Sequence, residues 1–220
     1  MTGFQAKGLV LVVSGPSGVG KGTIIRHLRP LCPNLRESVS FTTRAPRHDE
    51  VPGKDYHFIT VQEFDRRKVA GDFLEWAVVH RDQCYGTSRS QVRDAVTHGH
   101  DIVLEIDCQG AEQVRREWRD AVLVFVAPPT WAELERRLRG RDTEQEAEVQ
   151  KRIDSAFREI RGLCAYDYLI VNEDSREAAQ VLAGIVAAER ARMSRVPCEA
   201  IRNRLLAEGE ALHREPGHDA

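Results

Sequence analysis

The feature of this sequence with the clearest chemistry is a run of glycines that ends in a lysine, Gly15-Pro16-Ser17-Gly18-Val19-Gly20-Lys21-Gly22-Thr23. Glycines allow consecutive backbone N–H groups to turn toward one anion, and a helix that begins there adds positive potential. Lys21 can then reach the outer phosphates of a bound nucleotide. An apolar strand is expected directly before the run and a helix directly after it. This context distinguishes the run from a glycine-rich turn that contains a lysine by chance. We therefore predict a phosphate-binding loop for a nucleoside triphosphate.

The residue after the lysine departs from the common form of this motif. The usual pattern has Ser or Thr there, with its hydroxyl on magnesium, whereas this chain has Gly22 and carries a hydroxyl one position later, on Thr23. Further oxygen ligands follow an apolar strand expected at 102–106, where alternation places Glu105 and Asp107 on one face near the carboxyl end. Thr23, Glu105 and Asp107 are therefore candidate magnesium ligands. Pairing with an arginine or capping of a helix is the alternative for the two acids.

A second set of polar residues, between about 40 and 88, has the chemistry that a nucleoside monophosphate requires. Its arginines and tyrosines supply charge-assisted forks and O–H donors for a phosphate group. Its carboxylate, Glu75, lies among Phe73, Leu74 and Trp76, where we favour a binding role over that of a solvated strand residue. The set consists of Ser40, Arg44, Arg47, Tyr56, Glu75, Tyr85 and Thr87.

Two kinds of apolar pattern alternate along the chain and predict the elements that position these residues. Continuous apolar runs, typical of strands covered on both faces, occur at 9–13, 102–106, 122–126 and 168–171. Helical periodicity occurs at about 22–31, 88–98, 109–118, 130–138, 145–163 and 175–193. This alternation predicts an α/β fold with a parallel sheet flanked by helices. The segment 40–86 breaks the rhythm with prolines, glycines and short alternating stretches, and predicts a small mixed lobe inserted into that fold.

Composition and charge exclude several other classes of protein. The 220 residues are 41% apolar and 30% charged, and no apolar run reaches the roughly 18 residues of a membrane span. The net charge of −2 argues against a general nucleic-acid-binding surface. Five widely spaced cysteines without a CxxC pair predict neither a disulfide framework nor a zinc site. The run at 9–13 is too short for a signal peptide, so we expect a cytoplasmic protein with no membrane or nucleic-acid partner.

These motifs, in this order and spacing, resemble the guanylate kinases. The resemblance runs from about Gly8 to Met193. Its most specific parts are the segments 40–47, 73–77 and 104–111. It implies a P-loop NTPase-type parallel sheet flanked by helices, an inserted small mixed α/β lobe that binds GMP, and a helical lid. The implied domain covers 1–195, with a helical and polar tail at 196–220. Within that domain we expect a core at about 1–39, 97–136 and 153–195, the lobe at about 40–96, and the lid at about 137–152.

The resemblance also implies roles for individual residues. The loop at 15–23 binds ATP. The catalytic residues are Lys21, Arg44 and three lid arginines, Arg137, Arg141 and Arg152. The GMP phosphate is held by Arg44, Arg47, Tyr56 and Tyr85. The guanine is lined by Ser40, Glu75 and Thr87, with Asp107 close by. Guanine presents N1–H and N2–H₂ side by side, and one carboxylate can accept both, whereas adenine would leave that carboxylate unpaired.

The implied activity is transfer of the γ-phosphoryl group of ATP to GMP, and also to dGMP, in purine nucleotide metabolism. Mg²⁺ is the implied cofactor, ATP and GMP are the partners, and the protein is a monomer or a homodimer. The acceptor phosphate is already anionic near neutral pH, so catalysis consists of alignment and charge stabilisation without a general base. The alternative is a catalytically inactive module of the same fold that binds protein partners through the GMP site. The intact loop from Gly15 to Lys21 argues against it.

Overall fold

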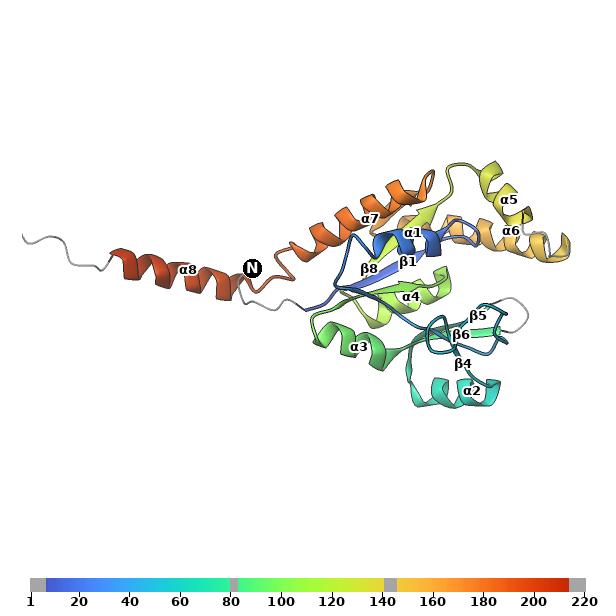
Figure 1. Ribbon diagram of the computed structural model, residues 1–220, viewed down its shortest axis with the longest axis horizontal. Helices are drawn as coiled ribbons and strands as arrows, with labels where there is room; N and C mark the ends of the chain where they lie inside the picture. Colours follow the sequence, from blue (N-terminus) through green and yellow to red (C-terminus); the bar gives the residue numbers. More distant parts are fainter. Residues whose placement is uncertain (1–6, 80–82, 141–145, 214–220) are drawn as a thin grey trace, which may run out of the picture.

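A parallel sheet of five strands, in the order β2-β7-β1-β8-β9, forms the centre of the fold. The computed structural model describes residues 7–79, 83–140 and 146–213 (Figure 1). The strands of the sheet are β1 (Val10–Ser14), β2 (Leu35–Glu37), β7 (Asp101–Glu105), β8 (Val122–Ala127) and β9 (Tyr168–Val171). β1 is the middle strand, so the loop that follows it opens at the centre of the sheet's carboxyl edge. The predicted parallel α/β fold is confirmed.

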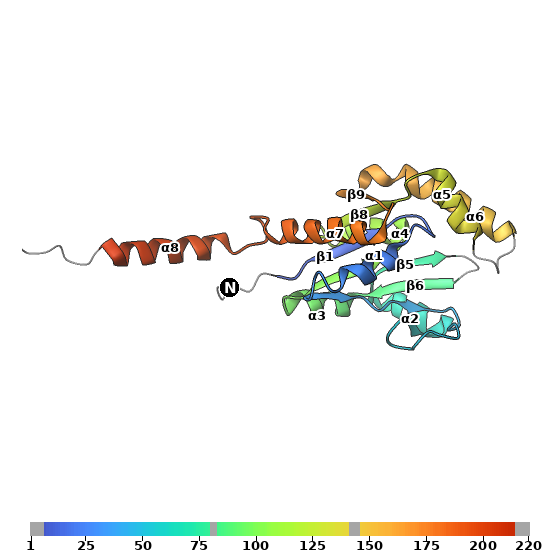
Figure 2. The same cartoon turned by 45° about the horizontal axis from the view of Figure 1, so that its top comes forward.

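Helices cover both faces of this sheet (Figures 1 and 2). One face carries α1 (Lys21–Leu28) and α7 (Ser175–Arg190), and the other carries α3 (Arg89–Thr97) and α4 (Cys108–Glu117). Along β1, Leu11 and Val13 pack with the first pair of helices, while Val10 and Val12 pack with the second pair. All four are at most 1% exposed. Burial on both faces explains why β1 is apolar throughout instead of alternating.

The predicted inserted lobe is a separate mixed sheet of four strands with one helix. The strand order is β4-β3-β6-β5, with β3 parallel to β4 and antiparallel to β6, and with β5 antiparallel to β6 at the edge. The elements are β3 (Phe41–Thr42), β4 (His57–Phe58), α2 (Val61–Ala70), β5 (Phe73–Val79) and β6 (Gln83–Ser88). Thr60 caps the start of α2 by accepting from the N–H of Glu63, and Gly71 ends the helix at a φ of +73°.

The predicted lid, about 137–152, overlaps the end of one helix, α5 (Trp131–Arg139), and the beginning of the next, α6 (Glu146–Arg161). The two helices have their own small apolar cluster, which contains Leu134, Leu138, Val149, Ile153 and Ala156. Arg141 lies outside the described residues. The short helix η1 (Leu163–Ala165) connects α6 to β9.

Two details differ from the sequence-based expectations. The edge strand β2 was not predicted, because its three residues, Leu-Arg-Glu, show no apolar run or alternation. α3 was assigned to the lobe, yet Val92, Ala95 and Val96 are buried in the cluster that β1 and β7 form with α4. We therefore propose that the lobe ends at about Ser88, where β6 passes into α3. No helix among the described residues is long and apolar enough to span a membrane.

The last helix, α8 (Cys198–His213), projects away from the rest of the fold (Figures 1 and 2). None of its residues is buried, and Leu205, Leu206 and Leu212 are all more than half exposed. Because burial of apolar surface is the main stabilising term in folding, this helix adds little to the stability of the fold.

Removal of residues 198–220 is therefore expected to shift the melting temperature by less than about 2 °C. Differential scanning calorimetry of the full and shortened chains measures this directly. A drop of ten degrees would show that α8 packs against the fold in solution.

Candidate active site

The loop between β1 and α1 has the backbone geometry of an anion cradle. Gly15, Gly18 and Gly20 have φ values of +137°, +80° and +100°, in the region that favours glycine. A Cβ on Gly15 would collide with the carbonyl oxygen of Val126, and a Cβ on Gly20 with the amide of Asn172. The loop is thus packed closely against β8 and Asn172, and its glycines cannot be replaced without strain.

Two cationic side chains lie on this loop. The Lys21 Nζ donates to the carbonyl oxygens of Gly15, at 2.5 Å, and Pro16, at 3.2 Å, so the ammonium is folded back over the turn. Arg137, from α5, donates to the carbonyl oxygens of Val19 and Asn172 at 3.3 and 3.4 Å. Its Nε also donates to Glu133 at 2.7 Å, which orients the guanidinium.

The first helical turn after the loop lies against the carboxyl end of β7. A Cβ on Gly22 would come within 3.2 Å of Glu105 Oε2, and the backbone N–H of Gly22 acts to lower the pKa of that carboxylate. This close approach accounts for glycine at the position after the lysine. Solvent reaches the Glu105 side chain, but the surrounding protein still raises its pKa by desolvation, and the Lys21 ammonium opposes that rise. Thr23 Oγ1 accepts from Arg26 at 3.1 Å.

The candidate magnesium ligands form a sparse set of oxygen donors. Among the described residues, no group of three or more His, Cys, Asp or Glu side chains could hold a metal ion alone. Magnesium in nucleotide sites typically uses one or two carboxylates together with phosphates and waters. Thr23, Glu105 and Asp107 offer oxygen atoms of the kind that magnesium prefers, and their role as its ligands stays a prediction.

In the lobe, three of the residues predicted for the monophosphate come together. The Nε of Arg44 donates to the Tyr85 hydroxyl at 3.2 Å, and the Arg44 guanidinium lies 5.3 Å from the centre of the Tyr56 ring. The two tyrosine rings are 5.9 Å apart. Desolvation raises the pKa of Tyr56, and the negative charge of Glu105 adds to the rise.

Glu50 is a member of this pocket that sequence reasoning missed. Its two carboxylate oxygens accept from both terminal nitrogens of Arg44, at 2.7 and 2.8 Å, and one also accepts from the backbone N–H of Arg47. Arg44 holds the pKa of Glu50 below its usual range. The Arg47 guanidinium is exposed and lies 3.9 Å from Glu50. No periodicity marks Glu50 in its irregular segment, so only the fold reveals this contact.

The carboxylate predicted for base recognition is buried at the junction of lobe and core. Glu75 is 3% exposed, accepts from the Thr87 hydroxyl at 2.5 Å, and lies so close to α4 that a Cβ on Gly110 would collide with it. Burial raises the pKa of Glu75 to about 7; Asp107 adds to the rise and Thr87 opposes it. Asp107 itself caps α4 by accepting from the N–H of Gly110 at 2.8 Å.

For the remaining predicted residues, the structure gives fewer contacts that bear on the site. Ser40 precedes β3, and its carbonyl oxygen accepts from the N–H of His57 at 2.9 Å. Arg152 lies partly buried on α6. The third lid arginine, Arg141, falls outside the described residues, so its place relative to the loop stays a prediction.

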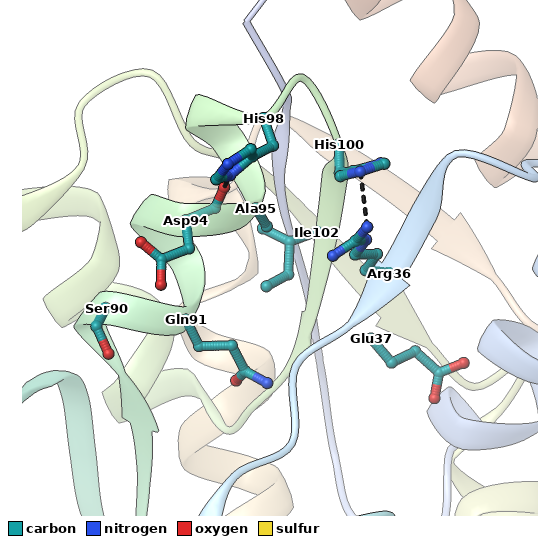
Figure 3. A pocket seen from close by; sticks show the side chains of 9 residues that line it. All are labelled: Arg36, Glu37, Ser90, Gln91, Asp94, Ala95, His98, His100 and Ile102. Atoms are coloured by element: carbon teal, nitrogen blue, oxygen red, sulfur yellow. Dashed lines mark hydrogen bonds between the residues drawn. The ribbon is translucent and has the colours of Figure 1, made fainter.

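Two cavities lie near these elements. One, of about 600 Å³, lies between β2 and α3, where Arg36 and His100 are hydrogen-bonded at 2.7 Å (Figure 3). It contains none of the residues predicted for the site. The other, of about 580 Å³, lies between α4 and α6 and is lined by Asp107, Cys108 and Glu159, so it adjoins the base pocket.

The fold and this geometry define a P-loop kinase. A loop with its lysine lies at the centre of a parallel sheet, Arg137 contacts that loop, and an inserted lobe brings Arg44 together with Tyr85. Separate pockets for a triphosphate and for a phosphorylated acceptor are typical of kinases that act on small substrates.

Comparisons with known proteins identify the family within this class. The guanylate kinase family model matches residues 7–189. The guanylate kinase of Syntrophotalea carbinolica is 47% identical over 197 residues, 90% of this chain and 93% of that protein. That of Thermotoga maritima is 44% identical over 189 residues, 86% of this chain and 91% of that protein. A crystal structure of guanylate kinase from Anaplasma phagocytophilum matches with a TM-score of 0.74 and 37% identity, over 87% of this chain and 91% of that chain. The chain belongs to the guanylate kinase family.

Proposed function

We propose that this enzyme transfers the γ-phosphoryl group of Mg·ATP to GMP, and also to dGMP, in cytoplasmic purine nucleotide metabolism. The observation that carries the choice of acceptor is the buried carboxylate of Glu75 beside the Arg44 pocket. A carboxylate kept out of water needs donors from its ligand, and guanine supplies two from N1–H and N2–H₂. Thr87 already donates to one oxygen, which orients the group for the base.

The monophosphate of the acceptor binds between Arg44, Tyr56 and Tyr85. In the structure, Glu50 accepts from both terminal nitrogens of Arg44, while Tyr85 accepts from its Nε. The ion pair with Glu50 therefore holds the Arg44 guanidinium in one orientation before the phosphate binds. The hydroxyls of Tyr56 and Tyr85 supply further donors to the phosphate oxygens. Arg47, which is exposed, closes on the same phosphate.

ATP binds with its phosphates in the loop at 15–23. In the structure, Lys21 and Arg137 donate to carbonyl oxygens of the loop. When ATP binds, they donate to its outer phosphates instead. Arg141 and Arg152 complete the lid, and closure of lobe and lid excludes water so that ATP is not hydrolysed. Magnesium, held by Thr23, Glu105 or Asp107 directly or through water, neutralises phosphate charge when bound. The γ-phosphoryl group then passes in line to an oxygen of the monophosphate.

Initial rates of ADP release with GMP, dGMP, AMP, CMP and UMP test this assignment. Turnover with GMP and dGMP and none with the other three is the expected result, because only guanine offers two adjacent donors to Glu75. Preferred use of AMP or of a pyrimidine nucleotide would contradict the role given to the lobe.

The raised pKa of Glu75 predicts a pH dependence for GMP. The carboxylate accepts from guanine only when ionised, so kcat/KM for GMP is expected to fall about tenfold for each pH unit below about 7. A pH profile of kcat/KM measures this slope. Glu75→Gln is the control, since its residual profile contains only the titration of the GMP phosphate and of other groups. Identical profiles for the two proteins would show that Glu75 does not titrate in this range.

A further inference from the structure

A side chain of α4 is hydrogen-bonded to the edge strand of the lobe. Gln113 Nε2 donates to the carbonyl oxygen of Trp76 at 2.7 Å, and the N–H of Trp76 donates to Gln113 Oε1 at 3.2 Å. The amide thus meets both backbone groups of one residue, as a neighbouring strand would. β5 is the last strand of the lobe sheet, and its other side pairs with β6. Gln113 therefore bonds the lobe to the core at one defined residue.

That residue is the direct neighbour of the buried carboxylate. Trp76 follows Glu75, and the side chain of Glu75 lies against Gly110, one turn before Gln113 on the same helix. Asp107, another three residues back, caps the helix and raises the pKa of Glu75. Residues three apart lie on neighbouring positions of a helix surface. The face of α4 formed by Asp107, Gly110 and Gln113 thus contacts Glu75 and its neighbour.

We propose that Gln113 is a positioning residue for guanine recognition: by fixing the backbone of Trp76, it holds the Glu75 carboxylate against Gly110 in the orientation that meets N1–H and N2–H₂. This inference rests on the proposed function. The Glu75 carboxylate occupies the space that a Cβ on Gly110 would fill, so the geometry of the base site depends on the position of β5 relative to α4. A single-residue amide pair fixes both the distance and the tilt of the strand, which apolar packing alone does not.

The test compares GMP with IMP, whose base lacks the 2-amino group. Gln113→Leu removes both hydrogen bonds to Trp76, and a longer one to the carbonyl oxygen of Gln109 at 3.3 Å, at similar volume. In this variant we expect KM for GMP to rise at least tenfold, about 1.4 kcal/mol. IMP makes one bond fewer to Glu75, so its kcat/KM falls less and the ratio of GMP to IMP use drops. KM for Mg·ATP stays within twofold, because the loop is not touched. Gln113→Met, which also removes both hydrogen bonds to Trp76 and keeps an unbranched side chain, is expected to lower the ratio equally and serves if the first variant folds poorly.

The matched control is Gln109→Ala, an exposed glutamine on the same helix, which is expected to leave the GMP to IMP ratio unchanged. An unchanged ratio in folded Gln113→Leu overturns the proposal. So does an equal loss for GMP, IMP and ATP, which would show a general structural role. If the wild-type enzyme does not prefer GMP over IMP, Glu75 does not recognise the 2-amino group of guanine. The proposed function of Glu75 then fails, and the positioning role of Gln113 fails with it.

Discussion

Lys21→Ala is expected to lower kcat by about 10³-fold or more while the fold stays intact. The ammonium lies over the loop, within hydrogen-bonding distance of two of its carbonyl oxygens, where the outer phosphates of ATP bind. Transfer of a phosphoryl group relies on cationic groups that stabilise the charge of the transition state, and single cations contribute about 10³- to 10⁵-fold in kinases and GTPases. Steady-state kinetics with saturating GMP measures the loss.

The control for this variant is Lys7→Ala, which removes an exposed lysine before β1 and is expected to leave kcat unchanged. GMP affinity, measured by calorimetry, should be the same in Lys21→Ala as in the wild type, because the lobe is untouched. Near-normal turnover in a folded Lys21→Ala protein would remove the phosphate loop from the mechanism.

Glu75→Gln is expected to lower kcat/KM for GMP by about 10³- to 10⁴-fold. The amide of Gln keeps the size of the side chain but replaces one acceptor oxygen with an NH₂ group. This donor would face the N–H donors of guanine and cannot accept from them. Sites built on buried hydrogen-bonding groups reject a mismatched partner by factors of this order. Comparison of GMP with AMP in wild type and variant measures the discrimination. Glu112→Gln, an exposed carboxylate of α4, is the control; an equal loss there, or a small loss at Glu75, would contradict base recognition by Glu75.

The same substitution is expected to stabilise the protein. Glu75 has a pKa of about 7 in the fold, above its ordinary value of 4.5, so the folded state keeps a proton that the unfolded state releases. Stability therefore falls as pH rises from about 4.5 to 7, and above that range the ionised, buried carboxylate costs about 3 kcal/mol. Glu75→Gln should raise the melting temperature at pH 8 by several degrees more than at pH 5, which thermal denaturation at the two pH values measures. Stability is thus lowered for recognition, as is common at binding sites.

The sequence was most informative where chemistry or burial leaves a local pattern. The strands β1, β7, β8 and β9 are apolar throughout because helices cover both of their faces, and each was predicted to within about one residue. β2 was missed because three residues at a sheet edge carry no periodic signal. The apolar face of α3, which lies within the predicted lobe, packs on β7, and this contact could not be predicted, since periodicity shows that a helix is amphipathic but not what it packs against.

The same distinction holds within the site. The glycine spacing before Lys21 reports a backbone conformation, which is a local property, and the loop has that conformation. Glu50 and Gln113 act through contacts with Arg44 and Trp76 that depend on tertiary structure, and neither stands in a motif. The sequence alone shows that Gly22 replaces the usual Ser or Thr. Only the structure shows that a side chain there would press on Glu105.

The most direct test of the central claim is to incubate the enzyme with magnesium, GMP and ATP labelled in its γ-phosphate, and to identify the labelled product. We predict that the label appears in the β-phosphate of GDP, with little in inorganic phosphate, and that the initial rate of GDP labelling at low GMP concentration falls by about 10³-fold or more when Glu75→Gln replaces the wild type. Label in inorganic phosphate alone, or bound GMP without labelled GDP, would contradict the account.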